Sequence, residues 1–258
     1  MKKCIVISDS FKGSLSSIEI GRIAEKSIRE HFPDCEVLSV PAADGGEGTV
    51  DCFMEALGGE RIVEPVTGPL GEPVNASYAV IGDRAVIEMA AAAGLPLVGD
   101  RKNPAVTTTY GVGQQIKSAI ERGVREIILG LGGSATNDAG CGCAAALGVK
   151  FYDADGKSFI PVGGTLKDIA KIDVSECKKL LAGVKITAMC DIDNPLCGET
   201  GAAYVFGPQK GADAEMVKML DAGLSHLADS IEREDLNGGM KFLVDAQGLF
   251  TEYTLTEI

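Results

Sequence analysis

Residues 2–40 read KKCIVISDSFKGSLSSIEIGRIAEKSIREHFPDCEVLSV, and this stretch decides the fold class. Its first apolar run, at 4–7, stops at polar residues, as a buried parallel strand does where it enters a loop. Ser16 and Glu19 have the spacing of a capping box, and apolar residues then recur at helical spacing. A second strand is expected over 36–40. The stretch therefore predicts a βαβ unit and an α/β fold.

Strand, polar loop and helix repeat after this unit. A loop at 43–49 leads into a segment whose apolar positions have helical spacing. The segments 74–81 and 84–89 then flank Gly82-Asp83, which is a hairpin signal and does not belong in a purely parallel sheet. We therefore expect a domain boundary near residue 70.

Three more elements shape the second part of the chain. Residues 126–131 and 184–190 are apolar runs typical of buried strands, and residues 213–232 predict an amphipathic helix. The apolar face of that helix is formed by Met216, Leu220, Leu224, Leu227 and Ile231. Strands that alternate with helices again favour an α/β architecture.

The composition is that of a soluble globular protein, with 258 residues of which 45% are hydrophobic and 24% charged. The net charge of −13 makes attraction to nucleic acid or to an anionic membrane unfavourable. The apolar run at the N-terminus is too short for a signal peptide or a membrane span, and the eight cysteines lack C-x-x-C ligand spacing. We therefore expect a cytoplasmic protein with reduced thiols and without a nucleic-acid or membrane partner.

Four loops combine glycine, carboxylate and small polar groups at the ends of predicted strands, where open α/β sheets bind their ligands. In the first loop, Asp9, Ser10 and Lys12 stand just before a predicted helix N-terminus. This combination suits an anionic group. A polar connection with an exposed lysine is the alternative.

The second loop contains two carboxylates, Asp44 and Glu47, separated by Gly45 and Gly46. The glycines let the backbone turn sharply, so both carboxylates could face one site and hold Mg²⁺ or accept a hydrogen bond from a substrate hydroxyl. Alternatively, Glu47 only stabilises the dipole of the helix that follows.

The third loop follows a strongly apolar strand and gathers small residues and potential donors before a helix. It contains neither the G-x-x-x-x-G-K-[ST] pattern nor a regular G-x-G-x-x-G. We interpret it as a phosphate-binding loop, although a plain glycine-rich turn would look similar. The residues concerned are Gly132, Gly133, Ser134, Thr136, Asn137 and Asp138.

The fourth loop offers Asp191, Asp193 and Asn194 at the end of a strand. Two acids and an amide are a suitable source of a general base and of metal contacts, while Asn-Pro is also a simple turn signal. His31 and His226 are expected on helices without partners, so a histidine-based triad or a zinc site is not supported.

Together these loops resemble the glycerate kinase family. Five of its motifs stand in order: I-x-D-S-F-K-G-S-L at 7–15, A-D-G-G-E-G-T at 43–49, G-G-S-A-T-N-D at 132–138, D-x-D-N-P-L at 191–196 and F-G-P-Q-K-G-A at 206–212. One short motif can arise by chance, but five in order over most of the chain point to the family.

The resemblance implies ATP-dependent phosphorylation of D-glycerate, with ATP and Mg²⁺ as cofactors and D-glycerate as the small-molecule substrate. It also implies a two-domain α/β fold with the substrate in the cleft between the domains. A flavodoxin/Rossmann-like parallel-sheet domain would begin with residues 1–70. An inserted restriction-enzyme-like α/β domain would occupy 71–234.

The resemblance also suggests roles for the residues of the four loops. Asp191 would act as the general base, and Lys12 and Asp44 would complete the catalytic set. The substrate would contact Asp9, Ser10, Lys12, Gly45, Gly46, Glu47 and Asn194. The nucleotide phosphates would contact Gly132, Gly133, Ser134, Thr136, Asn137 and Asp138. The metal would be held by Asp44, Asp191 and Asp193.

Residues 235–258 depart from the family pattern, which normally continues through a glycine-rich helix, further strands and a loop that returns to the first domain. We therefore expect a chain shortened at its C-terminus, with an incomplete first sheet that exposes apolar faces and a strand edge. Two alternatives to an active glycerate kinase stay open. One is an inactive remnant that binds a small anion or completes its sheet with another chain, and the other is a kinase for another small hydroxy acid. A homo-oligomer also stays open.

Overall fold

A computed structural model gives the fold and describes residues 2–11, 14–189 and 192–234. In chain order, the elements are β1 Lys2–Ser8, α1 Ser17–His31, β2 Cys35–Pro41, α2 Thr49–Leu57, β3 Glu60–Thr67, β4 Pro73–Ile81, β5 Arg84–Glu88, α3 Met89–Ala93, α4 Leu95–Val98, α5 Tyr110–Glu121, β6 Glu126–Gly130, α6 Cys141–Ala146, β7 Lys150–Tyr152, β8 Ser158–Phe159, the 3-10 turn η1 Gly163–Asp168, β9 Lys171–Asp173, α7 Ser175–Leu180, β10 Lys185–Met189, α8 Ala202–Phe206, the 3-10 turn η2 Pro208–Lys210 and α9 Ala214–Arg233. The strands form three sheets, with the orders β1-β2, β10-β6-β5-β4-β3 and β8-β7-β9.

The predicted βαβ unit is confirmed. β1 and β2 pair in parallel, and α1 packs against both strands. The Ser16–Glu19 capping box forms as expected: the backbone N–H of Glu19 donates to Ser16 Oγ at 3.2 Å, and that of Ser16 donates to Glu19 Oε2 at 2.8 Å. Ser17 then ties the helix to both strand ends, because its hydroxyl donates to Ser8 O at 2.6 Å and accepts from Ala42 N at 3.0 Å.

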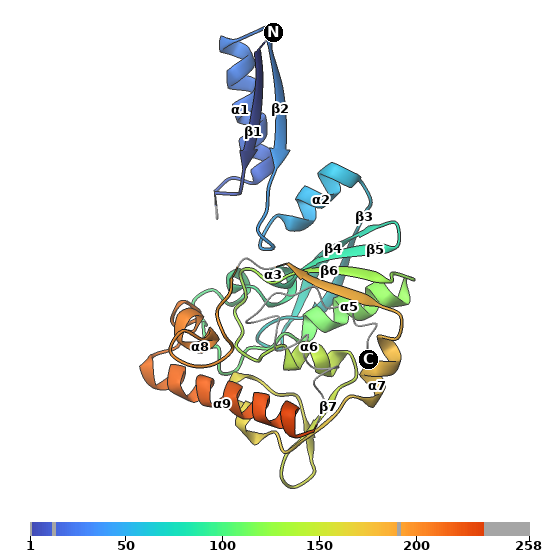
Figure 1. Cartoon of the computed structure of the whole chain (residues 1–258), viewed down its shortest axis with the longest axis vertical. Coiled ribbons are helices and arrows are strands. Elements are labelled where there is room, and N and C mark those ends of the chain that lie inside the picture. The colour runs from blue at the N-terminus through green and yellow to red at the C-terminus, as the bar shows by residue number, and fades with distance from the viewer. Residues whose placement is uncertain (1, 12–13, 190–191, 235–258) are drawn as a thin grey trace.

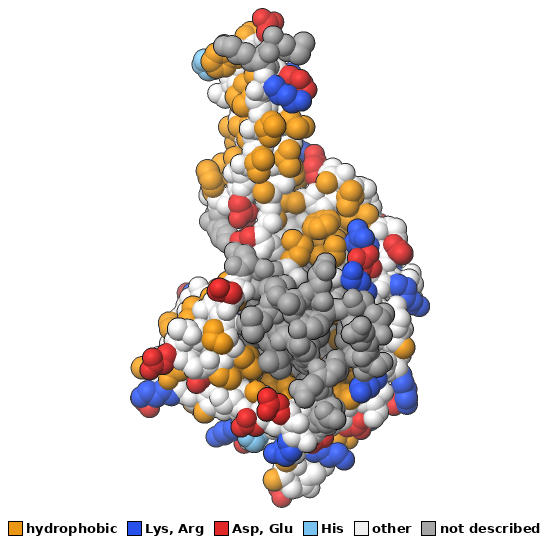
Figure 2. Space-filling view, viewed as in Figure 1, with side chains coloured by type: hydrophobic (Ala, Val, Ile, Leu, Met, Phe, Trp, Pro, Cys, Tyr) orange, Lys and Arg blue, Asp and Glu red, His pale blue; other side chains and the backbone are white. Residues whose placement is uncertain are grey.

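The other face of this two-stranded sheet is exposed and apolar. Ile5 lies beside Leu38 and Ile7 beside Val40, and these side chains are 40–66% exposed. Figure 1 shows the unit projecting from the rest of the molecule, and Figure 2 shows apolar side chains gathered over it. Parallel sheets are normally buried on both faces, so the expected exposure of the first sheet is confirmed for the part of the chain that the structure describes.

The second sheet is mixed, as the hairpin signal indicated. β4 and β5 pair in antiparallel fashion around Gly82-Asp83, with Ile81 opposite Arg84. β3 is antiparallel to β4, whereas β5, β6 and β10 run parallel to one another. The strand after α2 therefore does not extend the first sheet, because it pairs with β4. The change of sheet falls before Glu60, while the division into domains near residue 70 stays a prediction.

Side chains alternate between the two faces of this sheet. Tyr78, Ile87 and Ile127 face the helices α3 and α5, and all three are fully buried. The neighbouring Ala79 and Val86 face the opposite way and pack against Val50 of α2. Helix α2 therefore belongs to the core of the second sheet, although it follows β2 directly in sequence.

A second core holds the lower part of the molecule together, where α9 packs on η1 and β9 (Figure 1). The predicted apolar face of α9 is confirmed. Leu220, Leu224 and Leu227 are fully buried and Ile231 is 4% exposed, while Met216 is partly buried at the edge. Asp213 caps this helix by accepting from the backbone N–H groups of Glu215 and Met216. None of the helices in the described ranges is long and apolar enough to cross a membrane.

Candidate functional site

Two of the four predicted loops meet at one place, beside the end of β10. The backbone N–H of Gly132 donates to the carbonyl oxygen of Gly45 at 3.1 Å, and that of Leu131 donates to the carbonyl oxygen of Met189 at 3.1 Å. The loop after β2 thus contacts the loop after β6, and the end of β10 lies beside both. The carboxyl ends of strands are where open α/β sheets place ligands, so this junction is the candidate site.

Glycine is required at this junction because backbone packs on backbone. A Cβ atom at Gly132 would lie 2.7 Å from Gly46 Cα, and one at Gly130 would lie 2.2 Å from the carbonyl oxygen of Gly45. Gly45 itself has a φ of 87°, and a Cβ there would lie 2.6 Å from the carbonyl oxygen of Met189. A side chain at any of these positions would push the loops apart.

The loop after β2 is held by its own hydrogen bonds. Asp44 Oδ1 accepts from the backbone N–H of Gly46 at 2.9 Å, and Thr49 Oγ1 donates to the carbonyl oxygen of Gly46 at 2.8 Å. Asp44 is partly buried, whereas Glu47 is exposed and lines a neighbouring pocket. The two acids therefore lie in different surroundings, three residues apart.

Glu88 is a functional candidate that the sequence reasoning missed. It ends β5, and its Oε1 accepts from the backbone N–H of Val50 at 2.7 Å, in the first turn of α2. Burial raises the pKa of this carboxyl, the backbone hydrogen bonds from Val50 and Gly48 oppose the shift, and the nearby Asp51 charge adds to it. The signal that could have found Glu88 is a lone carboxylate between a buried strand and a run of alanines.

The first predicted loop lies across a pocket of about 420 Å³ from the loop after β2. Ser10 and Ser14 line one side, and Glu47, Gly48 and Asp51 line the other. The pocket thus lies between the N-termini of α1 and α2, whose backbone N–H groups favour an anion, whereas the carboxylates of Glu19, Glu47 and Asp51 in its lining oppose one. The side-chain oxygen of Ser10 is buried and has no hydrogen-bond partner among the described residues. Asp9 Oδ1 accepts from the backbone N–H of Ser10 at 2.6 Å.

The end and the middle of the loop after β6 differ in how their polar groups are paired. Asp138, at its end, is buried, and its carboxylate accepts from Thr109 N, Thr109 Oγ1, Gly140 N and Gly142 N at 2.8–3.2 Å. Burial nevertheless raises its pKa. A carboxylate with four protein donors stabilises the start of α6, and we therefore expect Asp138 to shape the loop without contacting a phosphate itself.

The middle of the same loop presents unused polar atoms. Thr136 and Asn137 are 0% and 1% exposed, and Thr136 Oγ1 and Asn137 Nδ2 have no hydrogen-bond partner among the described residues. Buried polar atoms are normally paired, so each such atom calls for an explanation. Both atoms can donate a hydrogen bond to an anion that reaches the loop.

The fourth loop is described only in part. Asp193 is exposed, and Asn194 Nδ2 donates to the carbonyl oxygen of Thr200 at 2.9 Å, so its amide is tied to its own loop. Asp191, the predicted general base, and Lys12, the predicted catalytic lysine, lie outside the described residues.

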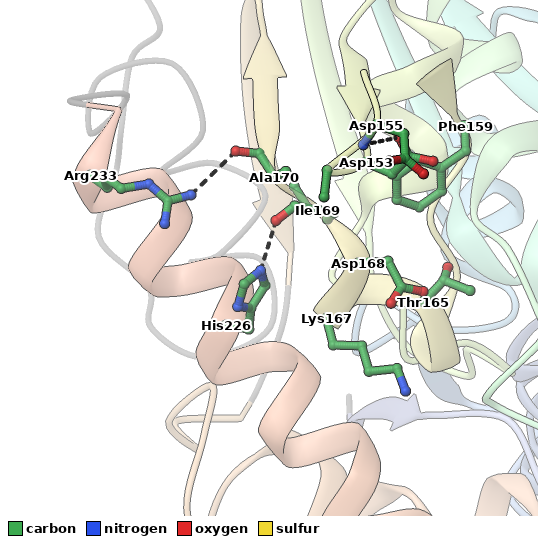
Figure 3. Close-up of a pocket in the computed structure, with 11 residues that line it drawn as sticks. Asp153, Asp155, Phe159, Thr165, Lys167, Asp168, Ile169, Ala170, His226 and Arg233 are labelled. Carbon is green, nitrogen blue, oxygen red and sulfur yellow. Dashed lines mark hydrogen bonds between the residues drawn. The ribbon is translucent and has the colours of Figure 1, made fainter. Parts of the chain in front are cut away.

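The two histidines have partners, contrary to expectation, although these partners are backbone carbonyls. His31 Nδ1 lies 2.9 Å from the carbonyl oxygen of Ser27, and His226 Nε2 lies 2.7 Å from that of Ile169. Figure 3 shows His226 and Arg233 of α9 beside a pocket of about 700 Å³ whose other wall includes Lys167 and Asp168. This pocket lies at α9 and the third sheet, and the predicted site residues do not line it.

A metal ion would find few preformed ligands here. Within the described ranges, no group of three or more histidine, cysteine, aspartate or glutamate side chains could hold a metal ion. Mg²⁺ is usually bound through one or two carboxylates together with substrate phosphates and water. Asp44, which is partly buried at the junction, could supply one such carboxylate.

Comparisons with known proteins identify the family. The sequence model described as Glycerate kinase family matches residues 4–246. This chain belongs to the glycerate kinase family. The match runs past residue 234, where the family pattern was expected to end.

Two relatives in this family illustrate the similarity. The chain is 49% identical over 234 residues to the Glycerate kinase of Bacillus subtilis (strain 168), and 48% identical over 234 residues to the Glycerate 2-kinase of Escherichia coli (strain K12). Each alignment covers 90% of this chain and 61% of the relative. The chain thus spans about three fifths of the length of these relatives.

A solved structure shares the fold. The crystal structure of a candidate glycerate kinase 2 from Salmonella typhimurium LT2 superposes with a TM-score of 0.81 at 43% sequence identity, over 99% of this chain and 67% of that chain. The α/β glycerate kinase fold that the sequence resemblance implied is thereby confirmed.

The contact between the loops can be tested with Gly45→Ala and its matched control Gly48→Ala. Both glycines have positive φ angles, 87° and 92°, so alanine carries a similar backbone penalty at either position. Only at position 45 would the new methyl group meet backbone. We expect a loss of about 1–2 kcal/mol for Gly48→Ala and about 2–5 kcal/mol for Gly45→Ala in urea unfolding. Equal losses would contradict the steric argument.

The buried Glu88 carboxyl predicts a pH-dependent stability. Its pKa is raised above 4.5 in the folded state, so the unfolded chain loses this proton first as the pH rises, and the charge then favours unfolding. Glu88→Gln keeps an acceptor for Val50 but carries no charge. Relative to wild type, we expect its free energy of unfolding to increase from about pH 4.5 toward neutral pH.

The exposed Glu55 on the same helix provides the control substitution, Glu55→Gln. Urea unfolding of the three proteins at several pH values measures the effect. If the difference in unfolding free energy between Glu88→Gln and wild type does not change with pH, burial does not destabilise the charged form of Glu88.

Proposed function

We propose that this chain carries the site for ATP-dependent phosphorylation of D-glycerate to a phosphoglycerate. Two facts support the proposal: the chain belongs to the glycerate kinase family, and its relatives carry the names Glycerate kinase and Glycerate 2-kinase. Because the chain spans about three fifths of those relatives, the complete reaction is a proposal for this chain.

The observation that carries the proposal is the hydrogen bond between Gly132 and Gly45. It brings a loop suited to phosphate beside a loop with carboxylates. Phosphoryl transfer depends mainly on positioning and on neutralisation of charge, with a carboxylate to orient the attacking hydroxyl. Two loops fixed to each other through backbone are well suited to hold donor and acceptor in line.

We assign the nucleotide phosphates to the loop after β6. Gly133 allows close approach of the phosphates, Gly132 fixes the loop to Gly45, and Ser134, Thr136 and Asn137 supply polar groups. The buried, unpaired Thr136 Oγ1 and Asn137 Nδ2 support this assignment. Asp138 then acts indirectly, because its carboxylate organises the turn into α6.

We assign D-glycerate to the pocket of about 420 Å³ between α1 and α2. Its carboxylate would face the two helix N-termini near Ser10, with Asp9 and Lys12 on the same loop. The unpaired Ser10 Oγ supports a polar ligand there. Gly45, Gly46, Glu47 and Asn194 complete the proposed substrate contacts.

We assign the general base to Asp191 and further catalytic contacts to Lys12 and Asp44. The end of β10 at Met189 lies beside Gly45. Mg²⁺ would be held by Asp44, Asp191 and Asp193 together with the ATP phosphates, and it would offset charge on the transferred group. A cytoplasmic location, where ATP and Mg²⁺ are available, fits this function.

A coupled assay of ADP release with ATP, Mg²⁺ and D-glycerate tests the proposal. We expect glycerate-dependent turnover that falls about 100-fold or more in Asp191→Asn, because the general base is lost. Asp155→Asn, in the separate pocket near α9, is the control and should keep the wild-type rate. Folded protein without glycerate-dependent turnover, or an undiminished Asp191→Asn variant, would contradict the proposal.

A substrate panel separates D-glycerate from other hydroxy acids. D-Lactate lacks the 3-hydroxyl of glycerate, 3-hydroxypropionate lacks the 2-hydroxyl, and L-glycerate has the opposite configuration. If the site bonds both hydroxyls, loss of either should lower kcat/KM by about 10-fold or more. Phosphorus NMR of the product then reports which hydroxyl is phosphorylated. A similar kcat/KM for D-lactate would favour a kinase for a different hydroxy acid.

A further inference from the structure

Lys210 is an almost fully buried lysine outside the four predicted loops, with 8% of its surface exposed. It ends η2, and Gly211 follows with a φ of 98°, so the chain reverses between α8 and α9. This turn is packed tightly, because a Cβ atom at Gly211 would lie 2.7 Å from the carbonyl oxygen of Lys102. Lys210 is therefore carried by a well-defined turn.

The Lys210 ammonium group reaches the loop after β6. Its Nζ donates to Ser134 Oγ at 2.8 Å and to the backbone carbonyl oxygen of Thr136. Gly45 holds the beginning of that loop and Asp138 holds its end. In the middle, the backbone of Ala135 bonds to Ala93 and Thr107, and Lys210 adds the contacts to Ser134 and Thr136 on either side. The loop is thereby tied to the turn that precedes α9.

Among the described residues, both acceptors of this ammonium are uncharged. Burial lowers the pKa of Lys210 to about 8, and the nearby Asp138 charge opposes the shift. The nearby segments also contain Lys102, beside Gly211, and Asp213, whose carboxylate caps α9. A buried cation without a bonded anion is costly, and a bound anion would offset that cost.

We propose that Lys210 is a positioning residue for anion binding at residues 132–138. It fixes Ser134 and Thr136 in place, and its positive charge favours a phosphate at the loop. The buried polar atoms of Thr136 and Asn137, on the same loop, would then find their partners in that phosphate. The anion is the phosphate of the nucleotide, so this inference rests on the proposed function.

Three variants test the role of Lys210. Lys210→Met removes charge and donors, whereas Lys210→Arg keeps a charge that does not titrate below pH 10. Lys218→Met is the control, since Lys218 is exposed on α9 and pairs only with Glu215 among the described residues. The measurements are the Kd of ADP by calorimetry from pH 6.5 to 9.5, amide hydrogen exchange of residues 132–138, and thermal unfolding.

We expect Lys210→Met to raise the Kd of ADP about 10- to 100-fold, because a charged hydrogen-bonding group is lost. The wild-type Kd should rise as the pH passes about 8, and that rise should be absent in Lys210→Arg. The carboxyl of Asp138 is unchanged in Lys210→Arg, so the comparison separates the two groups. Amides 134–136 should exchange faster in Lys210→Met and at the wild-type rate in Lys218→Met.

Wild-type ADP affinity together with wild-type exchange in Lys210→Met would overturn the proposal. An equal pH-dependent rise in wild type and Lys210→Arg would also overturn it. If Lys210→Met does not fold, the comparison of wild type with Lys210→Arg decides. If wild type does not bind ADP, the proposed function fails. Faster exchange of amides 134–136 in Lys210→Met, with wild-type exchange in Lys210→Arg, would still show that Lys210 positions the loop.

Discussion

The hydrogen bond from Gly132 N–H to Gly45 C=O is the contact on which the candidate site depends. It joins loops that leave two different sheets, so the relative placement of their side chains follows from backbone geometry. Backbone packing around this contact explains the glycines at 45, 130 and 132, where a Cβ atom would lie within 2.8 Å of neighbouring backbone. A site built on backbone in this way keeps its shape when its side chains exchange partners during a reaction.

Helix α2 supplies the second constraint, because it follows the first sheet in sequence and packs on the second. Glu88 strengthens this arrangement by accepting a hydrogen bond from Val50 at the start of the helix. The loop that carries Asp44 and Glu47 is therefore anchored to the second sheet at its far end. We therefore expect the position of this loop to depend more on β5 and β6 than on β1 and β2.

Local sequence signals predicted much of the fold. The capping box at Ser16, the hairpin at Gly82-Asp83 and the apolar face of α9 each depend on residues close in sequence, and all three form. The sheet to which β3 belongs could not be predicted in this way. Its partner is chosen by packing against β4, and an apolar run alone does not specify that partner.

The same limit applied to the site. The glycine-rich loops were predictable because glycine marks close backbone approach, and the motifs indicated their chemistry. The surroundings of individual carboxylates were not predictable. Two of the four donors to Asp138 belong to Thr109, which is 29 residues earlier, and Glu88 accepts from Val50, which is 38 residues earlier. Whether a carboxylate is free for chemistry depends on contacts that the linear pattern does not record.

The projecting β1–α1–β2 unit has a thermodynamic consequence. Most of its buried surface is internal, and its outer face is left to solvent at Ile5, Ile7, Leu38 and Val40. A unit with few apolar contacts to its neighbours can open without disturbing them. Residues 10 and 14–19 form one wall of the pocket between α1 and α2, so opening of this unit would remove that wall.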